Sequence, residues 1–549
     1  MLTCLFWQSA LGQYLQGTTG MVSSRSAIAS SVGADILRDG GNAVDAAVAT
    51  AFALAVVYPS AGNIGGGGFV VLSLPDGQVL TQDHRETAPA ASHRDMFLDD
   101  EGNIDRQRSF SSLQASGVPG TVAGLLDLLE RHGTMSREAV LAPAVKLAEA
   151  GWMLNEDIAN QFSSNIRAFR EHPASLEKFT RGGTPYAAGD IWVQPDLANT
   201  LKRISAEGRD GFYKGETANL IVAEMQANDG LITHADLENY EVVWREPVQG
   251  NYRDYEIWSM PPPSSGGIML LEMLNMLEPY DPGALGYGSV ETLHLMIEAQ
   301  RRAYADRAEY LGDPDFVDVP VEILTSKEYA RHRFSDFDPM AASDSNAIGA
   351  GSWPAESPDT THLSVMDSTG MAVSLTTTLN ATYGNRWVIP GTGILMNNEM
   401  PDFAAKPAPP APGSITGAVA NAIEPGKRMM SSMAPTIVKK DGQVLLITGS
   451  PGGSTIINTV LQVIINVLDH DMGLEQAVMS PRIHHQWQPD SIRAEPGAMS
   501  EAVQAALVEM GHGNISISNS QGDANSILVR DGVIEGMADL REDGGVAGF

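Results

Sequence analysis

The sequence predicts an α+β protein in which helices cover stacked β-sheets. Two observations support this fold class: apolar runs with helical character occupy much of residues 41–310, and paired strands joined by short polar turns dominate after residue 360. Helices and sheets each have an apolar side that must be buried, so alternating hairpins and helices are expected to pack in layers.

The first predicted element is a buried helix at 41–57. Asn42 can cap its start, Asp45 suits its first turn and Pro59 ends it. Four glycines at 65–68 then precede a strand at 69–74. A phosphate-binding loop has the opposite order, strand before glycines and helix after them. We therefore interpret the glycines as close backbone packing beside a functional site.

The middle of the chain is predicted to be mainly helical. Helical patterns at 139–150 and 290–307 stand out within 123–307, and a loop rich in proline, serine and glycine at 261–267 interrupts this region. Residues 335–358 are rich in Ser, Ala, Gly and Asp. This composition predicts an exposed, flexible linker.

From residue 360 onward the pattern changes to hairpins. The turns at 367–370, 441–442 and 531–532 separate alternating, strand-like segments. The predicted strand pairs are 362–366 with 371–377, 435–440 with 443–448, and 526–530 with 533–537. After a glycine-rich turn, the run 454–468 is apolar and compatible with a helix.

Composition excludes several functional classes. With 35 basic and 67 acidic residues the formal charge is −32, which argues against nucleic-acid binding. No apolar run reaches the roughly 18 residues that a membrane helix needs. Cys4 is the only cysteine, so the chain has no internal disulfide and no Cys-based metal site. The apolar start of the chain lacks basic residues and is a poor secretory signal.

Five motifs follow one another in the second half of the chain. They are Asp359–His362, Thr378 with Asn380, 397–403, 427–433 and 449–454. This ordered series closely resembles the small-subunit half of the γ-glutamyltransferases (glutathione hydrolases), which are N-terminal-nucleophile (Ntn) hydrolases. The resemblance runs from Gly20 through 117–124 to the end of the chain.

The resemblance implies a fold and a maturation step. The family fold is a four-layer αββα sandwich built from both autoprocessed subunits. Self-cleavage between Asp359 and Thr360 would give a large subunit region, 1–359, and a small subunit region, 360–549. The two regions would remain together as a heterodimer.

The implied nucleophile is Thr360. A threonine hydroxyl needs a nearby base, and a newly freed α-amine, with a pKa of about 7.7–8.0, supplies one without a histidine. The resemblance assigns Thr378 to orienting Thr360; by composition alone, Thr376 and Thr377 are equal candidates. It also assigns the oxyanion hole to Gly452 and Gly453, which lie between a strand and a helix start where backbone N–H groups are unpaired.

The resemblance further implies an α-amino acid substrate joined through its side chain. Its recognition needs a cation for the α-carboxylate and anions or carbonyls for the α-ammonium. The matching binding residues are Arg85, Ser431 and Ser432 for the carboxylate, Glu399 and Asp402 for the ammonium, and Asn380 as a further polar contact. Glutathione, other γ-glutamyl compounds and amino acid acceptors are the expected small-molecule partners.

No cofactor or metal is expected. The adjacent His484 and His485 could indicate zinc, but no third ligand with zinc spacing accompanies them, so we interpret them as structural. Residues 404–426, rich in proline and glycine, occupy the position of the family's lid and lack any aromatic residue. Because the family is usually exported, a periplasmic or extracellular location is expected.

Two alternative functions remain. An acylase of the same superfamily would remove a glutaryl-like side chain from a β-lactam; that substrate has no α-ammonium, so Glu399 and Asp402 favour a γ-glutamyl substrate. A binding or scaffold protein would have kept the fold without catalysis. The intact set of Thr360, Arg85, Asp402 and the glycine pair argues against it.

Overall fold

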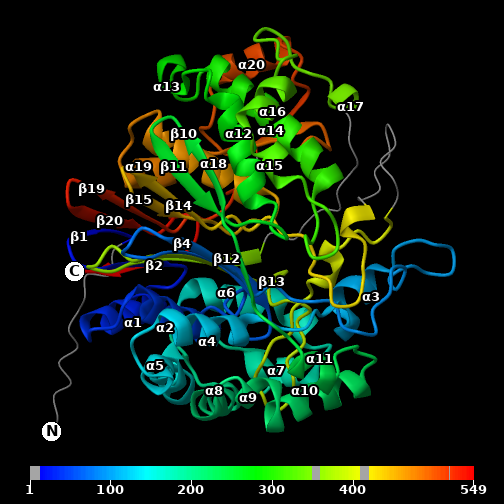
Figure 1. The fold of residues 1–549 in the computed structure, drawn as a ribbon. Coiled ribbons are helices and arrows are strands. Elements are labelled where there is room, and N and C mark those ends of the chain that lie inside the picture. Colours follow the sequence, from blue (N-terminus) through cyan, green and yellow to red (C-terminus); the bar gives the residue numbers. More distant parts are fainter. Residues whose placement is uncertain (1–12, 349–358, 408–418, 518–519) are drawn as a thin grey trace.

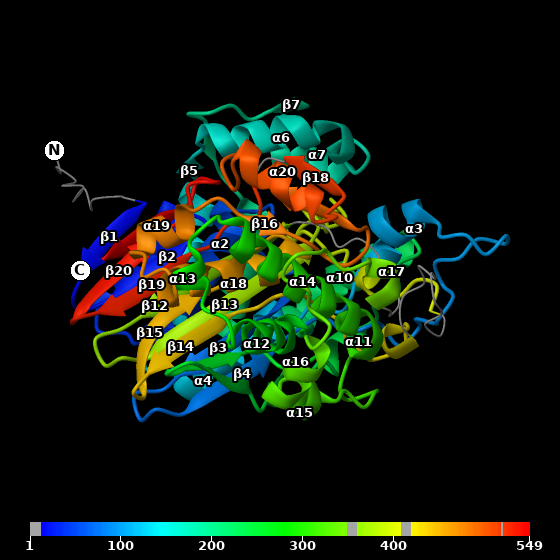
Figure 2. The same ribbon diagram turned by 90° about the horizontal axis from the view of Figure 1, so that it is seen from above.

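Two seven-stranded sheets stack face to face between two layers of helices (Figure 1). This computed structural model describes residues 13–348, 359–407, 419–517 and 520–549. Seen from above, α12 (Gly266–Leu277), α14 (Val290–Tyr310) and α18 (Thr455–Leu468) lie across the strands (Figure 2). The architecture confirms the predicted α+β class and the αββα layering.

The lower sheet contains the start of the small region at its centre. Its order is β21 (Gly545–Gly548), β2 (Met21–Ser24), β12 (Asp359–Met366), β13 (Ala372–Asn380), β3 (Gly67–Ser73), β4 (Val79–Asp83) and β9 (Val243–Arg245). All its pairings are antiparallel. The β12–β13 hairpin therefore lies between strands of the large region.

The upper sheet also combines both regions. Its order is β1 (Tyr14–Gly17), β20 (Val533–Met537), β19 (Ser526–Arg530), β15 (Gln443–Thr448), β14 (Thr436–Lys440), β11 (Tyr255–Ser259) and β10 (Val248–Tyr252). The small sheets are β16 (Ile483–His484), β17 (Ser491–Ala494) and β18 (Asn514–Ile517); β5 (Trp152–Met153) and β8 (Ile191–Trp192); and β6 (Thr180–Arg181) and β7 (Thr184–Pro185).

The remaining helices form the outer layers. Those packed below the lower sheet are α1 (Ala27–Arg38), α2 (Ala43–Val57), α4 (Thr121–His132), α5 (Arg137–Ala150), α6 (Glu156–Phe169), α7 (Pro173–Phe179), α8 (Pro195–Glu207), α9 (Asp210–Tyr213), α10 (Gly215–Ala227) and α11 (His234–Glu238). Those above the upper sheet include α15 (Val321–Leu324), α16 (Lys327–Arg333), α19 (Leu474–Met479) and α20 (Glu501–Glu509). Shorter helical segments are α3 (Arg106–Ser111), α13 (Pro282–Leu285), α17 (Ser345–Ile348), and the 3₁₀ turns η1 (Leu113–Ala115), η2 (Met400–Asp402) and η3 (Val419–Asn421).

The core follows the layers. One apolar cluster lies between the lower sheet and its helices, and a second lies between the upper sheet and its helices. A third, smaller cluster fills the space between the two sheets, with Val71, Met366 and Ile447 among its members. Buried serine, threonine and histidine side chains replace apolar ones where this inter-sheet space approaches the start of β12.

Most predicted elements are confirmed. The helix predicted at 41–57 is α2, with the reciprocal Asn42–Asp45 capping box in place, and the three predicted hairpins are β12–β13, β14–β15 and β19–β20. The β10–β11 hairpin was not predicted. Its turn at Arg253 and Asp254, where Arg253 adopts a φ of 52°, lies inside a region whose composition favours helices.

Most of residues 335–348 are exposed, as predicted for a linker, but the segment is anchored to the fold at several points. Ser345 is fully buried, the Ser343 N–H donates to Glu298 at 3.1 Å, and Asp336 pairs with Arg302 at 2.8 Å. Buried charges on α14 need polar partners, and this segment supplies them. Residues 349–358, the rest of the predicted linker, lie outside the described residues. None of the helices in the described part combines the length and apolar character that a bilayer span requires.

Candidate active site

Thr360 lies near the start of β12, where the strand pairs with β13, whereas pairing with β2 begins only at Leu363. Side chains alternate along a strand, and Leu363 packs in the core below the lower sheet. Thr360 therefore faces the upper sheet. Its cross-strand partner is Thr378, and their hydroxyl oxygens are 3.5 Å apart, longer than an ordinary O–H···O bond.

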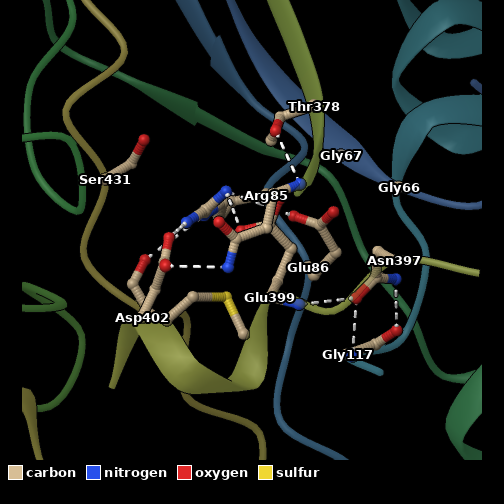
Figure 3. Close-up of polar contacts among 12 residues, drawn as sticks. Gly66, Gly67, Arg85, Glu86, Gly117, Thr378, Asn397, Glu399, Asp402 and Ser431 are labelled. Carbon is tan, nitrogen blue, oxygen red and sulfur yellow. Dashed lines mark hydrogen bonds and ion pairs between the residues drawn. The ribbon is translucent and has the colours of Figure 1, made fainter. Parts of the chain in front are cut away.

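The three threonines at the end of β13 have different surroundings. Thr376 Oγ1 contacts the His362 ring at 2.9 Å, and Thr377 Oγ1 donates to the Gly67 carbonyl at 2.9 Å on the opposite face. Thr378 Oγ1 accepts the Asn380 N–H at 2.7 Å (Figure 3). The register thus brings Thr378 opposite Thr360.

His362 lies two residues beyond Thr360 on the same face. Its ring nitrogens contact Thr376 Oγ1 at 2.9 Å and Ser364 Oγ at 3.1 Å. Complete burial lowers the pKa of His362 to about 3, so its ring is neutral. We therefore interpret His362 as a neutral, buried residue that packs next to Thr360 on the same face of β12.

Arg85, which follows β4, is the centre of a buried ionic cluster (Figure 3). It is 1% exposed, and its guanidinium lies 2.8 Å from Glu399, 2.6 Å from Asp402 and 3.6 Å from Glu86. It also donates to the backbone carbonyls of Met429 and Met430. One cation therefore faces three carboxylates, which gives the cluster a surplus of acid.

Burial controls the protonation of this cluster. Burial raises the pKa of Glu399 to about 8 and that of Glu86 to about 7, and the attraction of Arg85 offsets only part of this effect. Burial opposes the charge on Arg85 as well, but the carboxylates hold its pKa above the usual value. A ligand ammonium in this cluster would favour ionisation of the carboxyl groups.

Sequence reasoning missed Glu86. Both of its carboxylate oxygens are buried and accept no hydrogen bond within the described residues. A Cβ on Gly67 would lie 2.5 Å from the Glu86 carboxylate, and one on Gly117 would lie 2.8 Å from its Cβ. The glycines therefore make room for Glu86, as close backbone packing predicted. Its position next to Arg85 in the sequence could have indicated a role in the site. Neighbouring charged residues are also common on exposed turns, however, so the sequence alone did not distinguish the two cases.

Asn380 holds Asp402 in place. Its side-chain amide donates to the Asn398 carbonyl at 2.7 Å and to Asp402 at 2.9 Å. The residue ends β13 with a φ of 74°, a left-handed conformation that asparagine tolerates better than most residues. This turn brings β13 to the ionic cluster.

Ser431 and Ser432 directly follow the two carbonyls that Arg85 contacts. The Ser431 hydroxyl oxygen accepts the Met433 N–H at 3.1 Å, and the Ser432 oxygen accepts a hydrogen bond from Arg307 at 2.7 Å. Both side chains are buried. Both predicted serines therefore lie beside the Arg85 cluster.

Gly452 and Gly453 form the turn between β15 and α18. Their φ angles are 132° and 55°, a range that favours glycine, and their carbonyls accept the N–H groups of Thr455 and Ile456. Their own N–H groups donate no hydrogen bond within the described residues. Two free donors at a helix start are suited to an oxyanion.

The histidine pair is enclosed by hydrogen bonds. His484 contacts Asn458 and Gln486, and His485 contacts Asp490 at 3.0 Å. A different group, His294, Glu298 and His512, has three potential metal ligands close together. There the two rings bond to each other at 2.7 Å, and Glu298 is paired with Arg301 and Arg302.

The segment predicted as a lid is described only at its ends. Ala404 and Ala422 form a parallel bridge, and the Asn421 amide donates to the Asp402 carbonyl at 2.7 Å. Residues 408–418 lie outside the described residues. The segment therefore leaves and rejoins the fold beside Asp402.

Comparisons with known proteins show which family this chain belongs to. The sequence model of the gamma-glutamyltranspeptidase family matches residues 29–549. The glutathione hydrolase proenzyme of Escherichia coli (strain K12) is 47% identical over 525 residues, 95% of this chain and 90% of that protein. The cephalosporin acylase of Bacillus halodurans has a TM-score of 0.85 at 26% identity, over 100% of this chain and 99% of its own.

A second solved structure covers only part of this chain. The gamma-glutamyltranspeptidase of Helicobacter pylori is 46% identical with a TM-score of 0.58, over 59% of this chain and 93% of its own. The family match spans nearly the whole sequence, and the relatives are enzymes by name. The chain belongs to the gamma-glutamyltranspeptidase family of Ntn hydrolases.

Proposed function

We propose that this protein is a γ-glutamyltransferase and glutathione hydrolase that matures by cutting itself between Asp359 and Thr360. The observation that carries the proposal is the position of Thr360, opposite Thr378 and on the hairpin whose end, Asn380, holds Asp402 of the ionic cluster. The hairpin thus carries both the proposed nucleophile and the asparagine that contacts a carboxylate of the ionic cluster.

In the maturation step, the Thr360 hydroxyl attacks the Asp359 carbonyl. The peptide C–N bond breaks, the nitrogen takes a proton, and the acyl group becomes an ester on Thr360. Water then opens the ester and leaves a carboxylate on Asp359 and a free α-amine on Thr360. The name "proenzyme" of the Escherichia coli relative supports this step. So does the Helicobacter pylori structure, in which the matched chain is shorter than this one.

In the catalytic cycle, the same hydroxyl attacks the γ-carbonyl of the donor. The new α-amine accepts the hydroxyl proton and passes it to the departing amine, and the glutamyl group becomes an ester on Thr360. The free N–H groups of Gly452 and Gly453 stabilise the oxyanion. Water or an amino acid then attacks the ester and releases glutamate or a new γ-glutamyl compound.

In the donor pocket, Arg85, Ser431 and Ser432 bind the α-carboxylate, and Glu399 and Asp402 receive the α-ammonium. An ammonium compensates part of the acid surplus around Arg85, whereas a glutaryl group would leave it uncompensated. This charge balance favours a γ-glutamyl donor over the alternative supported by the likeness to cephalosporin acylase.

Two chromogenic substrates distinguish the γ-glutamyltransferase from the acylase and from the binding protein. We expect hydrolysis of γ-glutamyl p-nitroanilide and, at equal concentration, little hydrolysis of the glutaryl p-nitroanilide, which lacks only the amine. A preference for the glutaryl compound would instead support the acylase function. Inactivity on both, with an uncut chain, would support the binding protein.

The maturation step is tested by Thr360→Ala, which removes the attacking hydroxyl. The wild type should give two bands on a denaturing gel, with the smaller beginning Thr-Thr-His-Leu-Ser, whereas the variant should stay a single inactive chain. Thr361→Ala is the matched control: Thr361 is also buried, but its hydroxyl has no partner within the described residues, so this variant should still be cut. Cleavage of the Thr360→Ala chain at the same bond would exclude the mechanism.

A periplasmic or extracellular location remains a prediction. It rests on the family resemblance. Cell fractionation followed by an assay with γ-glutamyl p-nitroanilide tests it: activity confined to the cytoplasmic fraction would contradict it.

A further inference from the structure

Arg307 is a buried cation that contacts the serine segment of the donor pocket, which consists of Ser431 and Ser432. It lies near the end of α14, is 2% exposed, and donates through Nε to Ser265 Oγ at 2.8 Å and through Nη2 to Ser432 Oγ at 2.7 Å. These are two hydrogen bonds from one rigid guanidinium. They fix the separation of the two hydroxyl groups.

Ser265 extends this contact to the other serine of the pair. Its hydroxyl donates to the Ser431 carbonyl at 2.7 Å, and its backbone N–H donates to the same carbonyl at 2.8 Å. Arg307 thus holds Ser432 through its side chain and Ser431 through Ser265. Both contacts come from the large region and act on the small region.

The hydrogen-bond directions leave the hydroxyl protons available. Ser432 Oγ accepts from Arg307, Ser431 Oγ accepts from the Met433 N–H, and within the described residues neither hydroxyl donates to an acceptor. A hydroxyl whose oxygen accepts from a cation must point its single proton elsewhere and becomes a stronger donor. Both serines are therefore prepared to donate to an anion.

A second contact of α14 supports the same side of the site. One turn before Arg307, the Tyr304 hydroxyl donates to the carbonyl of Ser454, which follows Gly452 and Gly453. The helix is buried along most of its length, so its side chains have little freedom to move. It therefore provides a rigid support for two separate loops of the small region.

We propose that Arg307 is a positioning residue for donor binding: it orients the Ser432 hydroxyl directly and, through Ser265, fixes the backbone of Ser431, so that both serines donate to the α-carboxylate of the γ-glutamyl group. This inference rests on the proposed function. Arg307 reaches the serine segment through side chains, whereas Arg85 contacts the carbonyls of Met429 and Met430 just before it. The carboxylate would thus bind between the Ser432 hydroxyl, which Arg307 orients, and the hydroxyl of Ser431, whose backbone Arg307 fixes through Ser265.

The experiment is a double-mutant cycle on donor binding. Arg307→Gln, Ser432→Ala and the double variant are purified, maturation is checked on a denaturing gel, and KM and kcat are measured with γ-glutamyl p-nitroanilide. Loss of a charge-assisted hydrogen bond should raise KM for Arg307→Gln by about 10- to 100-fold, with kcat within about threefold of wild type. The KM increase of the double variant should be smaller than the product of the two single increases, because both changes remove the contact between Arg307 and Ser432. Arg307→Lys should recover part of the loss.

The matched control is Arg302→Gln. Arg302 is an equally buried arginine on α14, but it pairs with Glu298 and Asp336, away from the serines. Because it loses these ion pairs, the Arg302→Gln variant should have a lower melting temperature, but its KM for γ-glutamyl p-nitroanilide should not change. If the Arg307→Gln chain does not mature, Ser265→Ala replaces it in the cycle, and its KM should rise because the link to Ser431 is lost.

Two results would overturn the inference: an unchanged KM in the matured Arg307 or Ser265 variant, or multiplicative effects of Arg307→Gln and Ser432→Ala. A wild-type protein that does not cleave γ-glutamyl p-nitroanilide would instead refute the proposed function. The two failures are therefore distinguishable.

Discussion

At the residue scale, the guanidinium of Arg85 holds two carboxylates of the ionic cluster at once. Its Nη1 lies 2.8 Å from Glu399 and its Nη2 lies 2.6 Å from Asp402, so two separate nitrogens address two carboxylates. A lysine has the charge but only one nitrogen and cannot reproduce this geometry.

We therefore expect Arg85→Lys to mature normally but to use the donor poorly. Self-cleavage does not involve the α-groups of glutamate, so both bands should appear on a gel. Loss of one charge-assisted contact should lower kcat/KM for γ-glutamyl p-nitroanilide by about 10- to 100-fold. Arg302→Lys, at a buried arginine paired with Glu298 and Asp336 and not with the Arg85 cluster, is the control and should keep wild-type kinetics. Wild-type kcat/KM in Arg85→Lys would remove Arg85 from the pocket.

Glu86 should make stability depend on pH. Burial raises the pKa of Glu86 on folding from its ordinary value of 4.5 to about 7, so the folded state binds the proton more tightly. The stability gained in this way is fully present below pH 4.5 and is lost as the pH rises through about 7. Gln at this position mimics the protonated acid at every pH.

The melting temperature of Glu86→Gln relative to its parent should therefore increase between pH 5 and pH 8. Both proteins would carry Thr360→Ala, so that each unfolds as one chain. Glu101→Gln, at an exposed turn, is the control, for which the difference should stay constant. A constant difference for Glu86→Gln would show that Glu86 is ionised across this range.

At the element scale, the β12–β13 hairpin depends on close contact with the upper sheet. The ring of His362 packs against Gly449 at the end of β15, where a Cβ would lie 2.4 Å from two ring atoms. The ring cannot move easily, because it is buried and bonded to Thr376 and Ser364. The absence of a side chain at Gly449 thus allows the two sheets to approach each other closely near Thr360.

Gly449→Ala should cost about 1–3 kcal/mol of unfolding free energy, because the added methyl overpacks this contact. It should also slow self-cleavage, since displacing His362 moves the strand that carries Thr360. Denaturant unfolding in a Thr360→Ala background and a time course of cleavage measure the two effects. Gly513→Ala, where a Cβ meets nothing within 4 Å, is the control. Equal stability of the two variants would contradict the packing argument.

At the scale of the whole molecule, the proposed subunits are not separate domains. Strands β12 and β13 of the small region lie between β2 and β3 of the large region, and β14 pairs with β11 in the upper sheet. Separating the two regions would expose several strand edges together with the core between the sheets.

The matured chains should therefore remain associated without any covalent link. On size exclusion, they should elute together at the volume of the uncut Thr360→Ala chain, and both bands should appear in that peak on a denaturing gel. They should separate only when the protein is unfolded. Separate elution under native conditions would show that the shared sheets do not hold the two regions together.

The sequence by itself determined the local structure and most of the site. The capping residues of α2 and the polar turns of three hairpins act over a few neighbouring residues, so composition predicts them. The resemblance to the family predicted Thr360, Arg85 and Asp402 as site residues without coordinates, and the structure brings Arg85 and Asp402 into contact. The β10–β11 hairpin was not predicted, because the composition of this region favours helices.

Only the tertiary structure decided which distant residues meet. Glu86 and Arg307 are charged residues that usually lie at the surface, and nothing within a few positions of either indicates its burial. Their surroundings come from glycines, serines and carbonyls far along the chain, brought together by the packing of two sheets and a buried helix. The physical reason is that burial and ion pairing are properties of the packed layers, whereas sequence patterns report mainly on local backbone conformation.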